Sequence, residues 1–342
     1  MMCQGQPRVC FGHLPTPLEA APRLSEALGI ELLIKRDDLT GLCVGGNKAR
    51  LLEFAIGSLR RAGADTLIAY AAEQSNKLRD IAAVAARFAM KAILLIPGSS
   101  RPDGEAQQGN RLLFDLLGAE VRVVAPGAGR AAIMAAQEAV RDEVLRNGGH
   151  AVILDRHLGY GIDATVAYVN AAEELHHQLA AAGVSPGSAF IAGGAGMTAA
   201  GLALGLKHLG SSMRVTAVCI ASRAADLAPE IEFHAARAAD RLGLATRLTA
   251  ADLILADDHP EMEYGMVTPG LVAAIRRFAR LHGMVIDPIY NAKVALALVE
   301  RVATGRIAKG STVVLFNTGG GPAIYNSASA LCDATGDCVP LR

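Results

Sequence analysis

The amino-acid sequence predicts an α/β protein built from two doubly wound, Rossmann-like open sheets. Short, almost entirely apolar runs alternate along the chain with longer segments in which apolar residues recur at helical spacing. Strands that are apolar along their whole length are typical of parallel sheets covered by helices on both faces. The chain has 342 residues, of which 51% are hydrophobic, so we expect about two domains with large cores.

The first half of the chain shows the clearest alternation of strands and helices. Strands are predicted at 65–72, 91–98, 120–127 and 150–155, and helices at 75–90, 107–119 and 130–149. The last of these helices ends in two glycines, which are typical of helix C-termini. These elements predict a smaller α/β unit at residues 51–157.

The second half repeats the alternation. Strands are predicted at 188–194, 213–221, 252–258 and 310–320, and helices from the glycine-rich turn after 194 to about 210 and at 268–283. With the N-terminal segment they predict a larger unit, residues 1–50 plus 158–342, into which the smaller one is inserted. Ligands bind beyond the carboxyl ends of strands in doubly wound sheets, so we expect functional residues in the loops that follow strands.

The composition argues against several classes of partner. Lys plus Arg and Asp plus Glu are equal at 33 each, so no charge imbalance indicates nucleic acid or an anionic membrane. Aromatic residues make up only 4%, which argues against a base-stacking surface. No long apolar run predicts a membrane span, and no signal-peptide core is evident, so we expect a cytoplasmic protein. The six cysteines lack C-x-x-C spacing and predict neither a disulfide framework nor a metal site.

The first candidate site is the sequence "GGNK", in which Lys48 follows two glycines and an asparagine and precedes helix-forming residues. The helix dipole disfavours a cation at this end of a helix. Lys48 is therefore either a solvated surface lysine or an amine with a chemical role. In the second case the helix N-terminus helps to lower the pKa of the amine, as covalent chemistry at a lysine requires.

The second candidate is "AAEQSNK", residues 71–77, where a strand gives way to a helix. Gln74, Ser75 and Asn76 place amides and a hydroxyl at the helix N-terminus, where a carboxylate binds well. An ordinary helix cap made by Ser75 explains the same pattern.

The third candidate is the glycine-rich turn "IAGGAGMTAAG", residues 191–201. The backbone N–H groups of Ala195, Gly196 and Met197, with the hydroxyl of Thr198, can hold a phosphate. The glycines also fit a dinucleotide fingerprint, but the acidic residue expected about 20 positions later is missing, and Arg223 leaves only NADP open. Close packing of a helix on a strand is a further explanation of the glycines.

The fourth candidate is "LFNTGGGPAIY", residues 315–325, where Thr318 and a tight backbone follow a strand. A plain turn explains it equally well. A phosphate cradle, a lysine on a glycine turn and a carboxylate-binding loop are together what pyridoxal phosphate chemistry requires. In that chemistry the lysine holds the cofactor as a Schiff base until an amino acid substrate displaces it.

These motifs are in the order found in a known family. The chain resembles the fold type II pyridoxal-phosphate enzymes, which have a tryptophan synthase β-like fold, and in particular the D-cysteine desulfhydrase and 1-aminocyclopropane-1-carboxylate deaminase family. The likeness is carried by "KRDD", "GGNK", "QSN", "DPIY" and "TGG" and covers most of residues 14–325. It implies a homodimeric lyase that eliminates and deaminates a small β-substituted amino acid. For D-cysteine the products are pyruvate, ammonia and sulfide.

The resemblance also implies roles for the matched residues. Lys48 carries the cofactor, Asn76 contacts the ring hydroxyl, and Ala195 to Thr198 bind the phosphate. Tyr290 lies against the ring, and Thr318 approaches the pyridine nitrogen. The remaining matched residues contact substrate or move protons: Ser75, with Gln74 beside it, and Tyr264.

The chain departs from the family at several of these positions. Asn291 stands where the ring-opening deaminase has a glutamate that partners the pyridine nitrogen. A carboxylate there keeps the nitrogen protonated and strengthens the electron sink, so its loss favours β-elimination over ring opening. The deaminase activity stays open as an alternative, as does a catalytically silent ligand-binding protein, although such a protein has no reason to keep Lys48.

Other departures lie on the expected substrate side. Lys77 follows "QSN" where the family commonly has histidine, and Asn317 replaces a histidine before "TGG". Asp155, Arg156 and His157 replace a glycine/serine turn. Lys77 and Arg156 could select a substrate with an extra anionic group, such as cysteate, or could be exposed charges.

Overall fold

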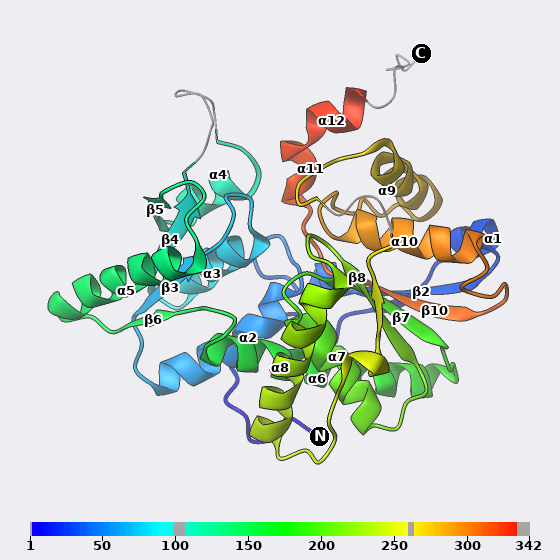
Figure 1. Ribbon diagram of the computed structural model, residues 1–342, viewed down its shortest axis with the longest axis horizontal. Coiled ribbons are helices and arrows are strands. Elements are labelled where there is room, and N and C mark those ends of the chain that lie inside the picture. Colours follow the sequence, from blue (N-terminus) through cyan, green and yellow to red (C-terminus); the bar gives the residue numbers. More distant parts are fainter. Residues whose placement is uncertain (1, 99–106, 259–262, 334–342) are drawn as a thin grey trace.

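The computed structural model describes residues 2–98, 107–258 and 263–333 and is an α/β structure with two sheets (Figure 1). A six-stranded sheet has the order β1-β2-β10-β7-β8-β9, and a four-stranded sheet has the order β5-β4-β3-β6. The predicted fold class is thus confirmed. None of the helices in these described ranges is both long and apolar enough to cross a membrane.

The four-stranded sheet is entirely parallel. Its strands are β3 (Thr66–Tyr70), β4 (Lys91–Pro97), β5 (Glu120–Val124) and β6 (Ala151–Ile153). Helices α3 (Asn76–Arg87), α4 (Gly109–Leu116) and α5 (Arg130–Arg146) surround it. Alternate residues of β3 face opposite cores: Leu67 packs into the main core, whereas Ile68 packs into a smaller core with Val140 of α5. Burial on both faces explains why these strands are apolar throughout.

The six-stranded sheet is parallel except at one edge. Its strands are β1 (Leu18–Ala20), β2 (Glu31–Arg36), β7 (Ser188–Gly193), β8 (Arg214–Cys219), β9 (Ile254–Ala256) and β10 (Thr312–Asn317). Strand β1 pairs antiparallel with β2, which the sequence did not predict. Strand β2 was also missed, because Lys35 interrupts its apolar run; that lysine is fully buried in the structure.

Helices cover both faces of the six-stranded sheet (Figure 1). One core lies against α2 (Lys48–Arg61), α6 (Gly159–Ala182), α7 (Met197–His208) and α8 (Ala224–Leu242). The other lies against α1 (Pro22–Leu28), α9 (Pro269–His282) and α10 (Asn291–Ala303). Short elements complete the chain: η1 (Asp37–Leu39), η2 (Ala250–Asp252), α11 (Pro322–Asn326) and α12 (Ala328–Asp333).

Helix α2, which begins at Lys48, is fixed by a buried network of charges. Arg50 donates to Asp37 and to Glu174 of α6, each at 2.8 Å, and Lys35 of β2 donates to the same glutamate. Tyr168 of α6 donates to Asp37 at 2.6 Å. Helix α2 packs on α6, which covers the six-stranded sheet, and on α3, which covers the four-stranded sheet, so it connects the two sheets. The domain boundaries at residues 50 and 157 stay a prediction.

Candidate active site

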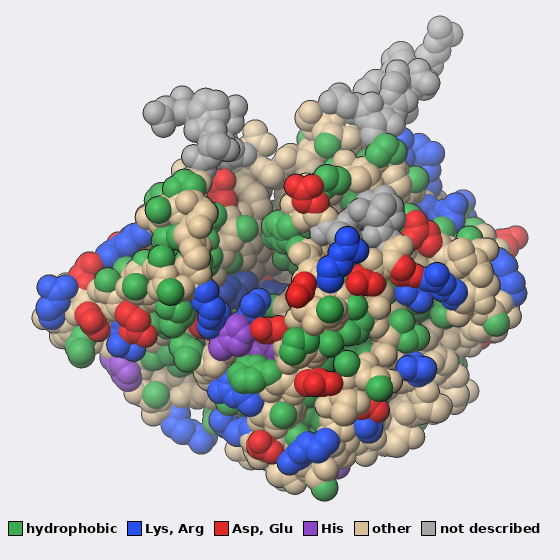
Figure 2. All heavy atoms as spheres, in the orientation of Figure 1, with side chains coloured by type: hydrophobic (Ala, Val, Ile, Leu, Met, Phe, Trp, Pro, Cys, Tyr) green, Lys and Arg blue, Asp and Glu red, His purple; other side chains and the backbone are tan. Residues whose placement is uncertain are grey.

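A cavity of about 530 Å³ lies where the carboxyl ends of strands from both sheets meet. Figure 2 shows the hollow between the part of the molecule that carries α3–α5 and the rest, with basic side chains along its edge. Every residue predicted from the sequence to act in catalysis or binding lines this cavity, with the exception of Gln74. The predicted residues that line it are Lys48, Ser75, Asn76, Lys77, Arg156, Ala195, Gly196, Met197, Thr198, Tyr264, Tyr290 and Thr318.

Lys48 is the first residue of α2 and follows a turn that only glycine can form. Gly45 has a φ of +77°, and a Cβ added there would lie 1.9 Å from the carbonyl oxygen of Asp38. The half-buried Lys48 donates from Nζ to Oδ1 of Asn47 at 2.9 Å. Burial lowers the pKa of Lys48 to about 8; the Asp80 carboxylate opposes this shift. Roughly a tenth of the amine is therefore neutral at pH 7, far more than for a lysine of ordinary pKa.

A buried arginine that the sequence analysis missed connects the Lys48 turn to α3. Arg79 is fully buried and donates to the carbonyl of Gly45 at 2.9 Å and to Oδ1 of Asn76 at 3.0 Å. Its charge is paired with Asp80 at 2.7 Å. Arg79 therefore fixes Asn76 relative to the turn that presents Lys48.

The N-terminus of α3 combines a cap with a binding surface. Ser75 is the N-cap residue, and its hydroxyl accepts from the backbone N–H groups of Lys77 and Leu78 at 3.2 and 3.3 Å, so the predicted cap is confirmed. Oδ1 of Asn76 accepts from Arg79 and from Asn110, the latter at 2.8 Å, which leaves the Nδ2 group to donate to a ligand.

Gln74 points toward α4 instead of lining the cavity. Its Oε1 accepts from the backbone N–H of Asn110 at 2.9 Å, and its Nε2 donates to the carbonyl of Gln108 at 3.1 Å. The sequence could not separate it from Ser75 and Asn76, because all three follow the same strand. In the structure Gln74 stabilises the start of α4 through these two hydrogen bonds.

The glycine-rich turn forms a cradle for an anion at the start of α7. Gly196 is the N-cap with a φ of +85°, and a Cβ there would lie 3.3 Å from the backbone nitrogen of Ile231. The first turn of α7 has no acidic residue, and its N–H groups have no partners within the helix. Thr198 accepts from Nδ2 of Asn47 at 3.5 Å, so this turn meets the Lys48 turn. This donor set fits a phosphate group.

Two tyrosines and a threonine complete the cavity on the side of the six-stranded sheet. The hydroxyls of Tyr264 and Tyr290 lie 3.2 Å apart, with the rings edge to face. Burial raises the pKa of both phenols, so both keep their protons at neutral pH. Thr318 donates from its backbone nitrogen and its hydroxyl to Oδ1 of Asn291, at 2.9 and 3.2 Å.

Asn291 lies behind the cavity wall and is fully buried. Its Nδ2 donates to Oδ1 of Asp287 and to the carbonyl of Gly319, both at 2.6 Å. All its polar atoms are thus used within the protein. Asn291 positions Thr318 and Gly319, and it offers no group to a ligand.

The substrate side of the cavity includes residues that the sequence analysis did not select. Arg130 at the start of α5 donates to Oδ1 of Asp155 at 3.2 Å, and both residues line the cavity. Tyr70 and Tyr160 line it as well. Asp155, which the sequence analysis already placed on the substrate side, follows β6, and Tyr70 is the last residue of β3. The expectation that ligands bind beyond the carboxyl ends of strands could therefore also have found Tyr70.

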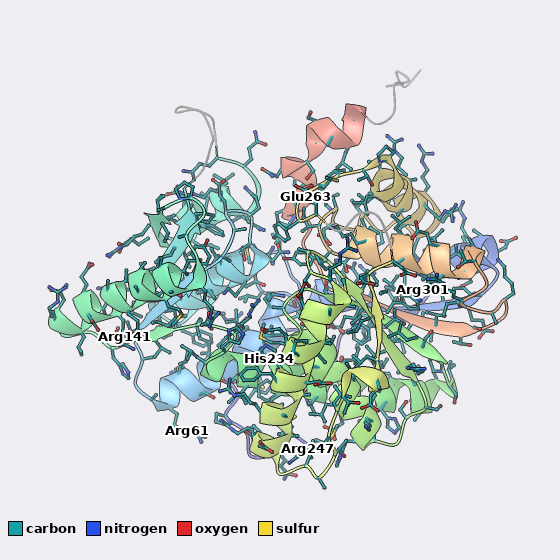
Figure 3. All side chains as sticks on the ribbon, in the orientation of Figure 1. Arg61, Arg141, His234, Arg247, Glu263 and Arg301 are labelled. Carbon is teal, nitrogen blue, oxygen red and sulfur yellow. The ribbon has the colours of Figure 1, made fainter. Side chains whose placement is uncertain are left out.

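His157 lies outside the lining residues and belongs to a cluster around Glu230 of α8. Its Nε2 is 3.0 Å from the Glu230 carboxylate, and Arg156 lies 3.5 Å from the same group. His234, labelled in Figure 3, stacks beside His157 with ring centroids 6.2 Å apart. Burial lowers the pKa of His234 to about 4, so it is neutral at physiological pH.

The residues of the site divide between the two sheets. Lys48, the 195–198 turn, Tyr290 and Thr318 come from the part that contains the six-stranded sheet. Ser75 to Lys77, Arg130 and Arg156 follow strands of the four-stranded sheet. The phosphate cradle and the lysine thus lie on one side, and the polar groups suited to an amino acid lie on the other.

One cavity thus holds the Lys48 amine with its lowered pKa, the anion cradle at the start of α7 and a second helix end, at the start of α3, that suits an anion. This combination defines an enzyme of the pyridoxal-phosphate class. A family profile described as "Pyridoxal-phosphate dependent enzyme" matches residues 9–319. The chain belongs to this family, and its cofactor is pyridoxal 5'-phosphate.

Curated relatives and solved structures show which members of the family this chain is similar to. The chain is 34% identical to the D-cysteine desulfhydrase of Klebsiella pneumoniae subsp. pneumoniae over 93% of this chain and 95% of the relative. It is 33% identical to the D-cysteine desulfhydrase of Salmonella typhimurium with the same coverage. A crystal structure described as an ACC deaminase homologue superposes with a TM-score of 0.87 and 29% identity, covering 97% of this chain and 98% of that one.

Proposed function

We propose that this chain catalyses the β-elimination and deamination of a small β-substituted amino acid of the D-cysteine type, giving pyruvate, ammonia and sulfide. The observation that carries the proposal is the Lys48 amine, held at a lowered pKa in the same cavity as the phosphate cradle and the start of α3. The names of the curated relatives support the same leaving group. Pyridoxal phosphate, when bound, supplies the electron sink for cleavage at Cα.

The N-terminus of α3 orients the substrate. The positive end of the helix dipole and the Nδ2 donor of Asn76 suit the α-carboxylate, and Ser75 caps the N–H groups of Lys77 and Leu78 and so holds the helix end in place. Arg79 fixes this surface against the Lys48 turn through Gly45. An amino acid bound there has its amino group and α-hydrogen facing the cavity that Lys48 lines.

The proton steps fall to Lys48 and the tyrosine pair. The neutral amine of Lys48 accepts the α-proton, with Ser75 as the alternative. Tyr264, which the sequence also suggested for this step, keeps its own proton because the pKa of its phenol is raised. The phenols of Tyr264 and Tyr290 stay protonated, so they can donate a hydrogen bond to the leaving sulfur.

Ring opening of an aminocyclopropane is the second candidate function, and the ACC deaminase homologue favours it. Asn291 argues against it, because its amide is used within the protein and puts no carboxylate beside Thr318. Among the described residues that line the cavity, Asp155 on the opposite sheet is the only acidic one. The site is therefore better suited to a substrate with a good leaving group.

The test is a panel of D- and L-cysteine, β-chloroalanine and 1-aminocyclopropane-1-carboxylate, assayed for oxo acid and for sulfide. We expect pyruvate and sulfide from a cysteine enantiomer and a Lys48→Ala variant without activity or cofactor-derived visible absorbance. Arg61→Gln, a change remote from the cavity, serves as the control. Oxobutyrate from the cyclopropane alone would favour the deaminase, and absence of cofactor binding would favour a silent binding protein.

The oligomeric state belongs to the same proposal. We propose a homodimer on the resemblance to the family, and sedimentation equilibrium of the purified chain tests it. A cytoplasmic location stays a prediction of the sequence.

A further inference from the structure

Three cationic side chains form one wall of the active-site cavity. Lys77 lies in the first turn of α3, Arg130 is the first residue of α5, and Arg156 follows β6. We call these three residues the basic wall. They come from three separate segments and line the same cavity, so their convergence is a property of the fold and not of one charged stretch.

Two carboxylates pair with the two arginines of the basic wall, and Lys77 is left as the cation without an ion pair in the described ranges. Asp155 accepts from Arg130 at 3.2 Å and from the backbone N–H of His157. Glu230 lies 3.5 Å from Arg156 but is shared with His157 at 3.0 Å. Lys77 forms no ion pair with any residue in the described ranges, and its Nζ donates to the carbonyl of Tyr70 at 3.0 Å.

A buried hydroxyl beside the basic wall also lacks a partner. Tyr160 is 4% exposed and lies between the active-site cavity and a second one, both of which it lines, and its hydroxyl makes no hydrogen bond within the described part of the chain. The Nζ of Lys77 lies 6.0 Å from the centre of its ring. A buried hydroxyl without a partner is costly, so this group indicates a ligand oxygen.

The basic wall is close to the reacting centre. The backbone nitrogen of Lys77 donates to Ser75, which caps the helix end that suits the substrate carboxylate. The charge of Lys77 also contributes to the lowered pKa of Lys48, so the two amines interact electrostatically. A substituent on Cβ of an amino acid bound between them lies within reach of the wall.

We infer that the basic wall binds a permanent oxyanion on the β-carbon of the substrate, which makes a β-sulfonate or a β-phosphate ester of an amino acid the substrate class. This inference rests on the proposed function and extends it to the leaving group. Lys77 and Tyr160 contact the oxyanion inside the cavity, and Arg130 and Arg156 attract it at the half-exposed mouth.

The reaction balances without a co-reactant other than water. Lys48 takes the α-proton, and the bond from Cβ to sulfur, or to the ester oxygen, breaks. Its electron pair leaves with the oxyanion as sulfite or phosphate, while the former Cα–H pair forms the new double bond. The resulting aminoacrylate takes up one water and gives pyruvate and ammonia.

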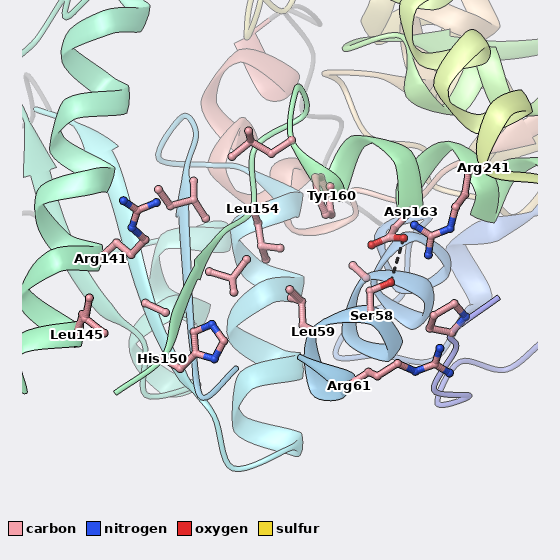
Figure 4. Close-up of a pocket in the computed structure, with 17 residues that line it drawn as sticks. Ser58, Leu59, Arg61, Arg141, Leu145, His150, Leu154, Tyr160, Asp163 and Arg241 are labelled. Atoms are coloured by element: carbon pink, nitrogen blue, oxygen red, sulfur yellow. Dashed lines mark hydrogen bonds between the residues drawn. The ribbon is translucent and has the colours of Figure 1, made fainter. Parts of the chain in front are cut away.

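The experiment compares both enantiomers of cysteate and O-phosphoserine with D-cysteine and β-chloroalanine, using pyruvate release by the holoenzyme. We expect at least one oxyanion substrate to exceed β-chloroalanine in kcat/KM. We define the selectivity ratio as kcat/KM for the oxyanion substrate divided by kcat/KM for β-chloroalanine. Lys77→Met should lower this ratio about tenfold or more, because a charge-assisted hydrogen bond is lost. Arg61→Gln removes a cation from a second cavity of about 750 Å³ (Figure 4) and should leave the ratio unchanged.

Binding without turnover gives an independent readout. Calorimetric titration of the holoenzyme should show tighter binding of 3-sulfopropionate than of butyrate, and Lys77→Met and Tyr160→Phe should each weaken only the former. Turnover of cysteine without turnover or binding of any oxyanion compound would overturn the inference and leave the proposed function intact. No oxo acid from any compound would overturn the proposed function itself. Comparison of cysteate with O-phosphoserine shows whether the enzyme prefers a sulfonate or a phosphate ester.

Discussion

The amine of Lys48 has its proton affinity set by its surroundings. Burial is the largest cause of its lowered pKa, and the neighbouring cations Arg79 and Lys77 act in the same direction. The sequence suggested the helix N-terminus as the cause, and the structure adds burial as the larger one. The pKa of about 8 lies well below the ordinary 10.5 of a lysine.

This pKa predicts how fast the cofactor-free protein takes up pyridoxal phosphate. Only the neutral amine attacks the aldehyde, so the uptake rate should rise with pH and level off above about 8. Lys77→Met removes a cation that lowers this pKa and should move the rise to higher pH. Stopped-flow absorbance checks both, and an unchanged midpoint in the variant would contradict the electrostatic coupling.

Arg79 is the second residue whose role is testable. Arg79→Met should leave Asp80 as an unpaired buried charge and lower the free energy of unfolding by about 3–5 kcal/mol. It should also weaken cofactor binding, because Asn76 loses its link to the Lys48 turn. Urea unfolding and cofactor titration measure the two effects.

Two further variants distinguish the effect of Arg79 on cofactor binding, through the position of Asn76, from its effect on the free energy of unfolding. Arg87→Met, an exposed change in the last turn of the same helix, should alter stability by less than about 1 kcal/mol. Adding Asp80→Asn to Arg79→Met should restore part of the stability but not the cofactor affinity. Recovery of both would mean that Arg79 has a structural role only.

At the scale of elements, the start of α7 depends on the backbone of Gly196. Gly196→Ala should lower cofactor affinity about tenfold, because its φ of +85° and the 3.3 Å approach to Ile231 force the turn to shift. Gly243→Ala is the matched control, since Gly243 has a φ of +65° and open space around it. Both variants should lose about 1 kcal/mol of stability. Equal cofactor affinity in the two would exclude a special role for the cradle.

The elements also show which features a sequence can reveal. The loops after β3, β7 and β10 were found because carboxyl ends of parallel strands meet at one edge of a sheet. Strand β2 was missed because the partner that permits burial of Lys35 is Glu174, far away in the sequence. Arg79 was missed for a similar reason: in a helical segment an arginine is ordinarily exposed, and its partner Gly45 lies in another element.

At the scale of the whole molecule, the buried charge network links the two sheets through α2. Hydrogen bonds from Arg50 and Lys35 outweigh burial and lower the pKa of Glu174 to about 2, against an ordinary 4.5. The stability that this carboxylate contributes is therefore complete above pH 4.5 and is lost as pH falls toward 2. The shift corresponds to about 3 kcal/mol.

Acid unfolding tests this contribution. The free energy of unfolding should decrease between pH 4.5 and 2 by about 3 kcal/mol more in the wild type than in Glu174→Gln. Glu138→Gln is the control, because Glu138 lies on the surface of α5 and pairs only with Arg141 in the described structure. Parallel curves for wild type and Glu174→Gln would show that the network does not titrate in this range.

The separation of the site between the two sheets has a consequence for evolution. The phosphate cradle and Lys48 belong to the part with the six-stranded sheet, whereas Lys77, Arg130 and Arg156 follow strands of the four-stranded sheet. Mutations at these three positions can therefore change the accepted amino acid without displacing the cradle or Lys48. A lineage with this architecture can acquire new leaving groups through neutral drift at a few loop positions. Lys77, Arg130 and Arg156 occupy such positions.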